Sequence, residues 1–334
     1  MGLDFTSIDF ETANGFRGSP CSVGLSKVRG GRIVEEASWL MRPPEGHDFF
    51  DRRNTGIHGI EDWMVADKPR FGELFPEIGA FIGQDLLVAH NAAFDLGVIR
   101  SALEVSELPG PAYDYACTVM LSRRTYSLPS HSLPFAAEAA GVPLENHHDA
   151  TADARACAGI MIDIVRRSGA AELAEFFALQ KMKPNHAPAY RPGVDALSKA
   201  TRDALERGTG APSPAGSWGG WPSEGVNPAP NPAAAPDHPL YGQTVVFTGN
   251  LGMPRQQAKD RAAELGARPA STVTRATTVL VVGDGFEPGD LRNGRVTGKA
   301  RRVLDLHERG QRIEVLSEAE FLQMIGGTWP LASQ

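Results

Sequence analysis

Two carboxylates stand one residue apart near the start of the chain, in the stretch SIDFETAN. Side chains alternate between the two faces of a β-strand, so Asp9 and Glu11 point to one face while Ile8 and Phe10 point to the other. At this point the pair has two interpretations: the solvent-exposed face of an edge strand, or half of a site that requires negative charge.

Two more acidic residues stand where the chain passes from one expected element to the next. Asp95 falls in the first helical turn after the apolar strand of LLVAHNAAFDLGVI, and Asp153 falls early in the helix expected for HHDATADARACAGI. Either one alone is typical of a helix cap or a dipole partner. His148, however, stands five residues before Asp153, across a junction between loop and helix, so both can approach one cavity from different sides.

The stretches DFET, AHNAAFD and HDATAD, in this order, resemble the three motifs of the DEDDh superfamily of 3′→5′ exonucleases, which includes the proofreading epsilon subunit of bacterial DNA polymerase III. The resemblance covers about residues 4–167. It implies that Asp9, Glu11, Asp95 and Asp153 are the catalytic, metal-binding carboxylates and that His148 is the general base.

The chemistry of phosphodiester hydrolysis explains these residue types. Two divalent ions about 3.5–4 Å apart activate water and stabilise the attacking and leaving oxygens. Mg²⁺ and Mn²⁺ prefer oxygen ligands, and a neutral His can accept the proton of the attacking water. The resemblance therefore implies two divalent ions, Mg²⁺ or Mn²⁺, as cofactors. His147 competes for the role of base, but the five-residue spacing of the family selects His148.

The resemblance also implies that Thr12 and Asn91 contact the substrate. Asn91 has a second interpretation, as the cap of the helix that follows it. Phe10 lies on the face opposite Asp9 and is expected in the core.

Strands are expected first in this part of the chain, followed by alternating helices and strands. This pattern predicts an α/β fold with a mixed sheet flanked by helices, and the resemblance implies that it is ribonuclease H-like. The expected strands are 5–12, a hairpin within 19–44 that turns at Gly30-Gly31, and 85–91; the expected helices are 70–84, 94–106, 132–142 and 150–169.

A change in composition separates two domains. Eleven of the 25 prolines lie between Pro184 and Pro239, which predicts a flexible linker, with VDALSKATRDALER as a short helix within it. We therefore expect an exonuclease domain at 1–183, a linker at 184–238 and a second domain at 239–328. Residues 1–183 carry 25 Asp and Glu against 17 Lys and Arg, a net charge of −8, so bound metal ions would supply the positive charge that a polyanionic substrate needs.

The expected elements of the second domain follow the order βαββαβα. This order predicts a small α/β domain with a parallel sheet flanked by helices. Its strands are expected at 243–251, 268–271, 277–285 and 312–317, and its helices at 254–267, 299–310 and 318–327. FTGNL, Gly266, TTVLVVGD and VLSEAEF resemble a BRCT domain, in particular that of bacterial NAD-dependent DNA ligases. Phe321 stands where many BRCT domains have Trp.

The BRCT resemblance implies a phosphate-binding site. Thr248 and Gly249 end a strand just before a helix, a natural position for an anion, and Arg255 and Lys299 are suitably basic. The ligand would be a phosphorylated partner protein or a DNA 5′-phosphate. The alternative is that this domain packs against a partner protein without phosphate.

The composition is ordinary for a soluble protein, at 42% hydrophobic and 22% charged residues. The absence of a long apolar run or a signal sequence predicts a cytoplasmic protein that does not enter a membrane. Cys21, Cys117 and Cys157 are far apart and are expected to be reduced thiols.

The function expected from both resemblances is metal-dependent 3′→5′ removal of nucleoside 5′-monophosphates from single-stranded DNA 3′ ends, in replication or repair, with the BRCT domain as a targeting module. Two alternatives remain: RNA as the substrate, since the motif residues do not read the 2′-hydroxyl, and a catalytically silent BRCT scaffold. The complete acidic set argues against the scaffold.

Overall fold

The computed structural model describes residues 2–207, 225–236, 238–249, 251, 253–283 and 298–325. The chain divides into two compact units, residues 1–126 with 136–211 and residues 127–135 with 212–334. Each unit contains one β-sheet.

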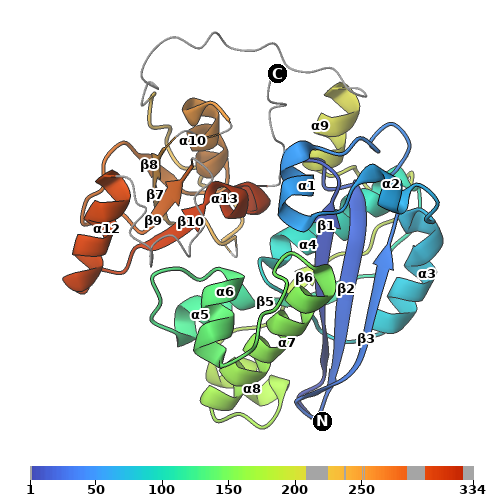
Figure 1. Cartoon of the computed structure of the whole chain (residues 1–334). Helices are drawn as coiled ribbons and strands as arrows, with labels where there is room; N and C mark the ends of the chain where they lie inside the picture. Colours follow the sequence, from blue (N-terminus) through green and yellow to red (C-terminus); the bar gives the residue numbers. More distant parts are fainter. Residues whose placement is uncertain are drawn as a thin grey trace. The chain divides into compact units, whose positions relative to one another are not determined.

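The first unit is built on a six-stranded mixed sheet with the order β3-β2-β1-β4-β5-β6 (Figure 1). β1 lies antiparallel to β2, and β2 to β3, whereas β1, β4 and β5 are parallel and β6 returns antiparallel on β5. The strands span Phe5–Thr12 (β1), Pro20–Arg29 (β2), Arg32–Leu40 (β3), Leu87–Ala89 (β4), Tyr113–Cys117 (β5) and Asn185–Ala187 (β6).

The hairpin of β2 and β3 has the expected turn. Gly30 and Gly31 both have positive φ, 57° and 72°, as a two-residue turn that matches the strand twist requires. On the other side, β1 and β2 keep a regular register up to Glu11, which pairs with Ser22. The register then shifts, and Thr12 pairs with Pro20.

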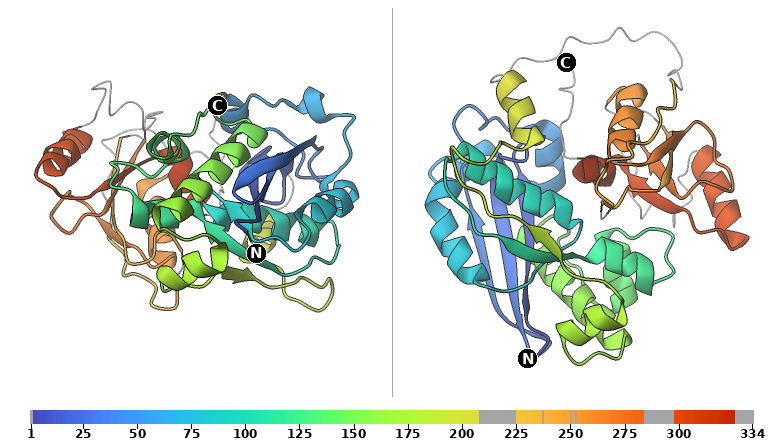
Figure 2. Two further views of the ribbon diagram at one scale, coloured as in Figure 1. Left: turned by 90° about the horizontal axis from the view of Figure 1, so that it is seen from below. Right: turned by 180° about the vertical axis from the view of Figure 1, so that it is seen from behind.

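Helices cover both faces of this sheet (Figure 2). α7 packs along β1, β2 and β3, whereas Phe10 of β1 points away from it and contacts Phe71 of α3, with ring centroids 6.4 Å apart. Phe10 is 2% exposed, so its predicted place in the core is confirmed. The helices are α1 Arg52–His58, α2 Asp62–Val65, α3 Phe71–Ile82, α4 Ala92–Val105, α5 Thr118–Thr125, α6 Leu133–Ala140, α7 Ala150–Arg167, α8 Leu173–Leu179 and α9 Lys199–Arg207.

A glycine allows α7 to approach the sheet closely. Gly24 of β2 pairs with Asp9, and a Cβ atom at this position would lie 2.2 Å from the backbone oxygen of Ala150, the first residue of α7. Since backbone atoms cannot give way as a flexible side chain can, only glycine allows this contact. The first turn of α7, which carries Asp153, therefore rests directly beside Asp9.

The structure differs from the predicted linker where it follows the first sheet. β6 pairs with β5 through residues 185–187, and α9 packs against α4. The carboxylate of Glu104, 4% exposed, accepts hydrogen bonds from the backbone N–H of Ser198 at 2.7 Å and from the hydroxyl of Thr201. This part of the chain is ordered because an existing sheet edge and a buried carboxylate satisfy its polar groups, which its proline-rich composition does not reveal.

The second unit contains a four-stranded, fully parallel sheet with the order β10-β9-β7-β8. The predicted order of elements is confirmed over the described residues. They are β7 Thr244–Thr248, α10 Arg255–Glu264, β8 Arg268–Ala270, β9 Val279–Val282, α12 Gly298–Glu308, β10 Glu314–Ser317 and α13 Glu318–Ile325. Phe321 of α13 meets Phe247 edge-on at 5.0 Å, so it fills an aromatic position of the core.

The far end of the predicted linker also differs from a flexible chain. Gln256 of α10 is bonded to both the backbone N–H and the carbonyl of Val226. The fully buried amine of Lys259 donates to the Asn227 side chain at 2.8 Å. Asn231 donates its backbone N–H to Ala263 O at 2.8 Å. Residues 208–224, the middle of the predicted linker, lie outside the described residues.

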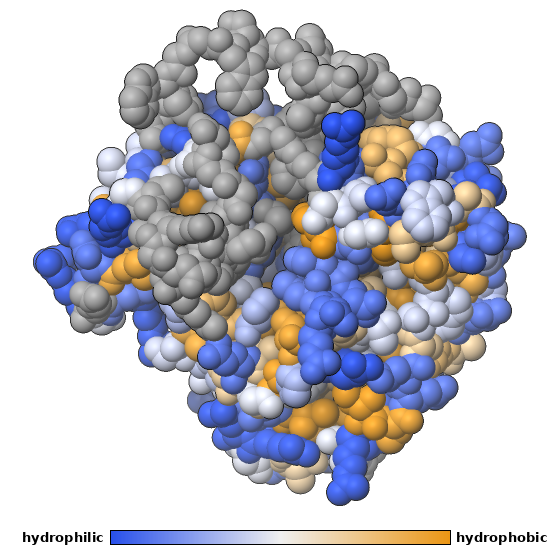
Figure 3. All heavy atoms as spheres, in the orientation of Figure 1, coloured by the Kyte–Doolittle hydropathy of each residue, from blue (hydrophilic) through white to orange (hydrophobic). Residues whose placement is uncertain are grey.

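Cys21, Cys117 and Cys157 are buried free thiols, as predicted. Within the described residues, no helix is long and apolar enough to cross a membrane. On the face drawn in Figure 3, hydrophobic side chains are scattered among hydrophilic ones.

Candidate active site

Three predicted carboxylates meet at the end of β1. One oxygen from each of Asp9, Glu11 and Asp153 lies within 4.8 Å of the other two. Asp9 and Glu11 point to the same face of β1, and α7 brings Asp153 to that face through the close approach at Gly24. Carboxylates at this separation can share a cation as ligands.

Asp95, the fourth predicted carboxylate, comes from helix α4. It lies in the first turn of α4, is 1% exposed, and accepts a hydrogen bond from the backbone N–H of Phe10 through Oδ1 at 3.0 Å. Its second oxygen, Oδ2, is buried and has no donor among the described residues. A buried carboxylate oxygen without a donor is costly, and a bound cation would satisfy it.

Burial and mutual repulsion disfavour the charged state of this cluster. Burial, followed by the charges of Asp153 and Asp95, raises the pKa of both Asp9 and Glu11 well above their usual values. Burial raises the pKa of Asp95 to about 8, although the N–H of Phe10 and the charge of Arg17 act against this. Divalent cations would remove the repulsion, so the residues present fit a metal centre.

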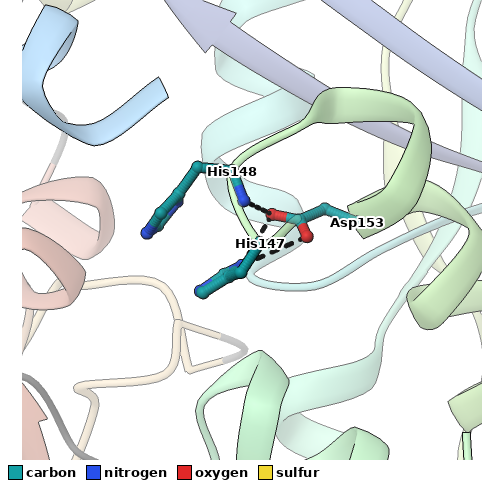
Figure 4. A group of neighbouring side chains, drawn as sticks. All are labelled: His147, His148 and Asp153. Atoms are coloured by element: carbon teal, nitrogen blue, oxygen red, sulfur yellow. Dashed lines mark hydrogen bonds and ion pairs between the residues drawn. The ribbon is translucent and has the colours of Figure 1, made fainter. Parts of the chain in front are cut away.

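His147 and His148 lie side by side over Asp153 (Figure 4). Nδ1 of His147 lies 2.9 and 3.1 Å from the two carboxylate oxygens of Asp153, while the backbone N–H of His148 donates to Oδ2 at 3.0 Å. The two imidazole rings are stacked with centroids 3.8 Å apart. The sequence-predicted neighbourhood of His148 and Asp153 is therefore present, with His147 as the direct side-chain partner of the carboxylate.

The backbone before α7 is shaped to present these rings. His148 has a φ of 75°, a left-handed conformation that His tolerates better than most residues. Asp149 follows as the N-cap of α7 and accepts from the N–H groups of Thr151 and Ala152. Burial and the neighbouring His147 lower the pKa of His148 to about 4, so its ring is neutral at pH 7.

Asn91 and Thr12, predicted to contact substrate, each stand next to an element that carries a carboxylate of the cluster: Asn91 precedes α4, which holds Asp95, and Thr12 follows Glu11 in β1. Asn91 occupies the N-cap position of α4 with a φ of 72°, but its side chain makes no capping hydrogen bond. Its Oδ1 and Nδ2 are both buried and have no partner among the described residues. The capping interpretation of the Asn91 side chain is therefore wrong. Thr12 is 6% exposed and is bonded to α1.

Sequence reasoning missed three residues near the site. Arg17 donates to Ala93 O at 2.8 Å in the first turn of α4. Asn54 and His58 of α1 both contact the backbone oxygen of Thr12. In the sequence, only the basic residue in GFRGS and the polar residues in RNTGIH could have indicated these three. Neither stretch stands at a distance from β1 that predicts a contact with it.

The four predicted phosphate-site residues of the second unit gather at the end of β7. Arg255 donates to Gly249 O at 2.7 Å, and Lys299 donates to the carbonyl of Phe247 at 3.1 Å, next to Thr248. Gly249 has a φ of 76°, which turns the chain there.

The mixed sheet and the acidic cluster define the class of the first unit, and comparison with known families agrees. Residues 6–161 match the exonuclease family RNase_T, and residues 235–325 match the BRCA1 C-terminus (BRCT) domain. The chain carries an exonuclease domain of ribonuclease H-like fold, followed by a BRCT domain.

Several relatives of known name match part of the chain. A protein of Mycobacterium tuberculosis provisionally named a bifunctional exonuclease/endonuclease is 28% identical over 230 residues, 62% of this chain and 35% of that protein. DNA polymerase III PolC-type of Thermotoga maritima is 30% identical over 186 residues, and that of Clostridium perfringens 36% over 142. The alignments cover 54% and 42% of this chain but only 13% and 9% of those two polymerases. The chain thus matches a small part of each relative.

Two solved structures are also similar. Exonuclease X in complex with 5′ overhanging duplex DNA is 29% identical with a TM-score of 0.41, and the match covers 50% of this chain and 95% of that one. Exonuclease I of E. coli in complex with a dT13 oligonucleotide is 18% identical with a TM-score of 0.44, over 50% of this chain and 42% of that one.

Proposed function

We propose that this protein is a metal-dependent 3′→5′ exonuclease that releases nucleoside 5′-monophosphates from single-stranded DNA 3′ ends. The observation that carries the proposal is the convergence of Asp9, Glu11 and Asp153 within 4.8 Å, beside the unsatisfied buried oxygen of Asp95. The exonuclease family match and the presence of a BRCT domain support a role in DNA replication or repair.

Asp9, Glu11, Asp95 and Asp153 would hold two divalent cations, Mg²⁺ or Mn²⁺. When bound, such ions lower the pKa of water and neutralise charge on the phosphate and the leaving oxygen. The protein contributes rigidity: Asp9 and Glu11 belong to a central strand, and Asp95 is held by the N–H of Phe10. Ligands held by regular elements keep their geometry during the reaction.

His148 would act as the general base. A base must be neutral to accept a proton, and its low pKa keeps the ring neutral over the whole physiological range. Its backbone N–H is tied to the same carboxylate that would bind metal, which keeps the ring next to the cluster. Thr12 and Asn91 would contact the terminal nucleotide, and the unpartnered amide of Asn91 supports this role.

Degradation of single-stranded DNA oligonucleotides tests the proposal. An oligonucleotide labelled at its 5′ end should yield a ladder that shortens from the 3′ end in the presence of Mg²⁺ or Mn²⁺, and EDTA should stop the reaction. Asp9→Ala should abolish it, whereas the matched control Asp67→Ala, at a carboxylate whose side chain is 80% exposed, should not. Undiminished activity of Asp9→Ala would refute the assignment. RNA of the same sequence, run in parallel, determines which nucleic acid is preferred.

For the BRCT domain, we propose a targeting role through Thr248, Gly249, Arg255 and Lys299, with a phosphorylated partner protein or a DNA 5′-phosphate as the ligand. Their gathering at the end of β7 supports this. Binding of 5′-phosphorylated and unphosphorylated DNA, and of phosphorylated and unphosphorylated peptides, by wild type and Lys299→Ala tests it. Equal binding of both forms would favour a phosphate-independent interface.

A further inference from the structure

Helix α1 is attached to the last residue of β1 by side-chain hydrogen bonds. Nδ2 of Asn54 donates to Thr12 O at 2.9 Å and lies 3.3 Å from the Thr12 hydroxyl. Nε2 of His58 lies 3.2 Å from the same carbonyl. Because the N–H of Ile60 donates to Nδ1 of His58, Nε2 carries the proton and donates to Thr12.

These bonds determine how the Asn54 amide is oriented. Its nitrogen must face the carbonyl of Thr12, which can only accept, so its oxygen faces the other way. That oxygen, Oδ1, is buried and has no donor among the residues that the structure describes. A buried acceptor without a donor is uncommon in native proteins, and a donor from a ligand would satisfy it.

The position of Asn54 places this acceptor beside the proposed active site. Thr12 directly follows Glu11, one of the clustered carboxylates. His58, one helical turn after Asn54, contacts the same carbonyl of Thr12. Asn54 and His58 therefore both lie at the end of β1, next to Glu11, where the terminal nucleotide would lie.

The chemistry of the acceptor limits what can bind to it. Phosphate oxygens of a phosphodiester only accept hydrogen bonds and cannot satisfy Oδ1. The N–H groups of bases can donate, but their positions differ between the bases, whereas an exonuclease must process each nucleotide in turn. A sugar hydroxyl donates and is common to every 3′-terminal nucleotide.

We propose that Asn54 recognises the sugar of the terminal nucleotide by accepting a hydrogen bond from one of its hydroxyl groups. This inference rests on the proposed exonuclease function. The donor is either the 3′-hydroxyl or, in RNA, the 2′-hydroxyl. Asn54 then makes the site selective for ends that carry that hydroxyl.

The test uses oligodeoxynucleotides that differ only in the last sugar: 2′-deoxy with a 3′-hydroxyl, 2′,3′-dideoxy, and 3′-deoxy with a 2′-hydroxyl. Release of the terminal nucleotide is measured in a single turnover, because every later cycle starts from an ordinary 3′-hydroxyl. We expect full-length wild type to cleave the dideoxy end about 3- to 10-fold more slowly than the end that carries the recognised hydroxyl, the range for one neutral hydrogen bond. Of the two hydroxyl-bearing ends, the one that is cleaved faster than the dideoxy end carries the hydroxyl that Asn54 recognises.

Asn54→Leu should cleave the hydroxyl and dideoxy ends at equal rates. Relative to wild type, its rate should fall on the hydroxyl end and stay unchanged on the dideoxy end. Its melting temperature and its stabilisation by Mn²⁺ report that the fold and the metal site are intact. Thr55→Ala, on the same helix, is the control and should keep the wild-type ratio. The inference is overturned if wild type does not discriminate, if Asn54→Leu discriminates as well as wild type, or if Thr55→Ala also loses discrimination. Failure of wild type to cleave any of the three ends would refute the proposed function itself.

Discussion

Replacing Asp95 by Asn should stabilise the metal-free protein at alkaline pH. Burial raises the pKa of Asp95 from 3.8 to about 8 in the folded protein. Between these values the folded state binds a proton that the unfolded state has lost, so the stability contributed by this group falls as the pH rises. Relative to a group that stays neutral, an Asp95 with these two pKa values lowers the stability of the folded state by on the order of 5 kcal/mol at pH 8. The loss is only about 2 kcal/mol at pH 5, where the folded carboxyl is still protonated.

Asn has the same shape as Asp and carries no charge. Its Oδ1 can still accept from the N–H of Phe10, and its amide nitrogen would take the place of the oxygen that has no donor. The charge of Asp95 also raises the pKa of Asp9 and Glu11, so a neutral amide in its place removes that repulsion. The substitution should therefore remove the cost of the buried charge without leaving a cavity.

Scanning calorimetry of the full chain in EDTA at pH 5 and pH 8 measures the effect. The transition of the exonuclease domain, identified by its response to Mn²⁺ in wild type, should move upward in Asp95→Asn at pH 8 and much less at pH 5. With Mn²⁺ the order should reverse, because only wild type keeps the full ligand set. Equal stability of the two proteins at pH 8 in EDTA, or an advantage that does not shrink at pH 5, would refute the reasoning.

Three further predictions address other parts of the structure. Gly24→Ala should destabilise the exonuclease domain by about 1–3 kcal/mol and abolish its stabilisation by Mn²⁺, because the new Cβ would lie 2.2 Å from Ala150 O; an unchanged Mn²⁺ shift in calorimetry would contradict this. Asn227→Ala should destabilise the BRCT domain by about 1–3 kcal/mol, since it removes an acceptor from the buried amine of Lys259; denaturant unfolding measures it, and a neutral result would show that this hydrogen bond contributes nothing to stability. His148→Gln should lower kcat by about 100-fold or more while the Mn²⁺ shift in melting temperature persists; a wild-type rate would exclude His148 as the base.

Local patterns predicted the elements that carry the site. The alternation in FTSIDFET, the glycine pair at residues 30 and 31, and the apolar periodicity of residues 150–169 each depend on neighbours in sequence, and all three elements are present. The strands β5 and β6 and the helices α1, α2, α5 and α8 were not predicted. They are short, and their stability depends on the surfaces that they cover.

The predicted flexible linker also shows what local sequence patterns cannot predict. Their composition predicts that these segments cannot fold alone. It does not reveal the partners that order them: Glu104 for α9, and Gln256 and Lys259 for residues 226 and 227. Each partner is far away in sequence, so no local pattern contains it.

By itself, the sequence determined the chemical character of the site: which carboxylates stand on one face of β1, which acids begin helices, and that a His precedes the last of them. Those properties follow from strand and helix periodicity. Only the tertiary structure decided that Gly24 brings α7 beside Asp9, that His147 is the direct partner of Asp153, and that Asn54 presents an unsatisfied oxygen next to Thr12. The first and the third of these facts arise from contacts between elements that are far apart in the sequence, where packing and hydrogen-bond satisfaction, rather than local propensity, set the geometry. The second depends on how the loop before α7 folds back on the helix.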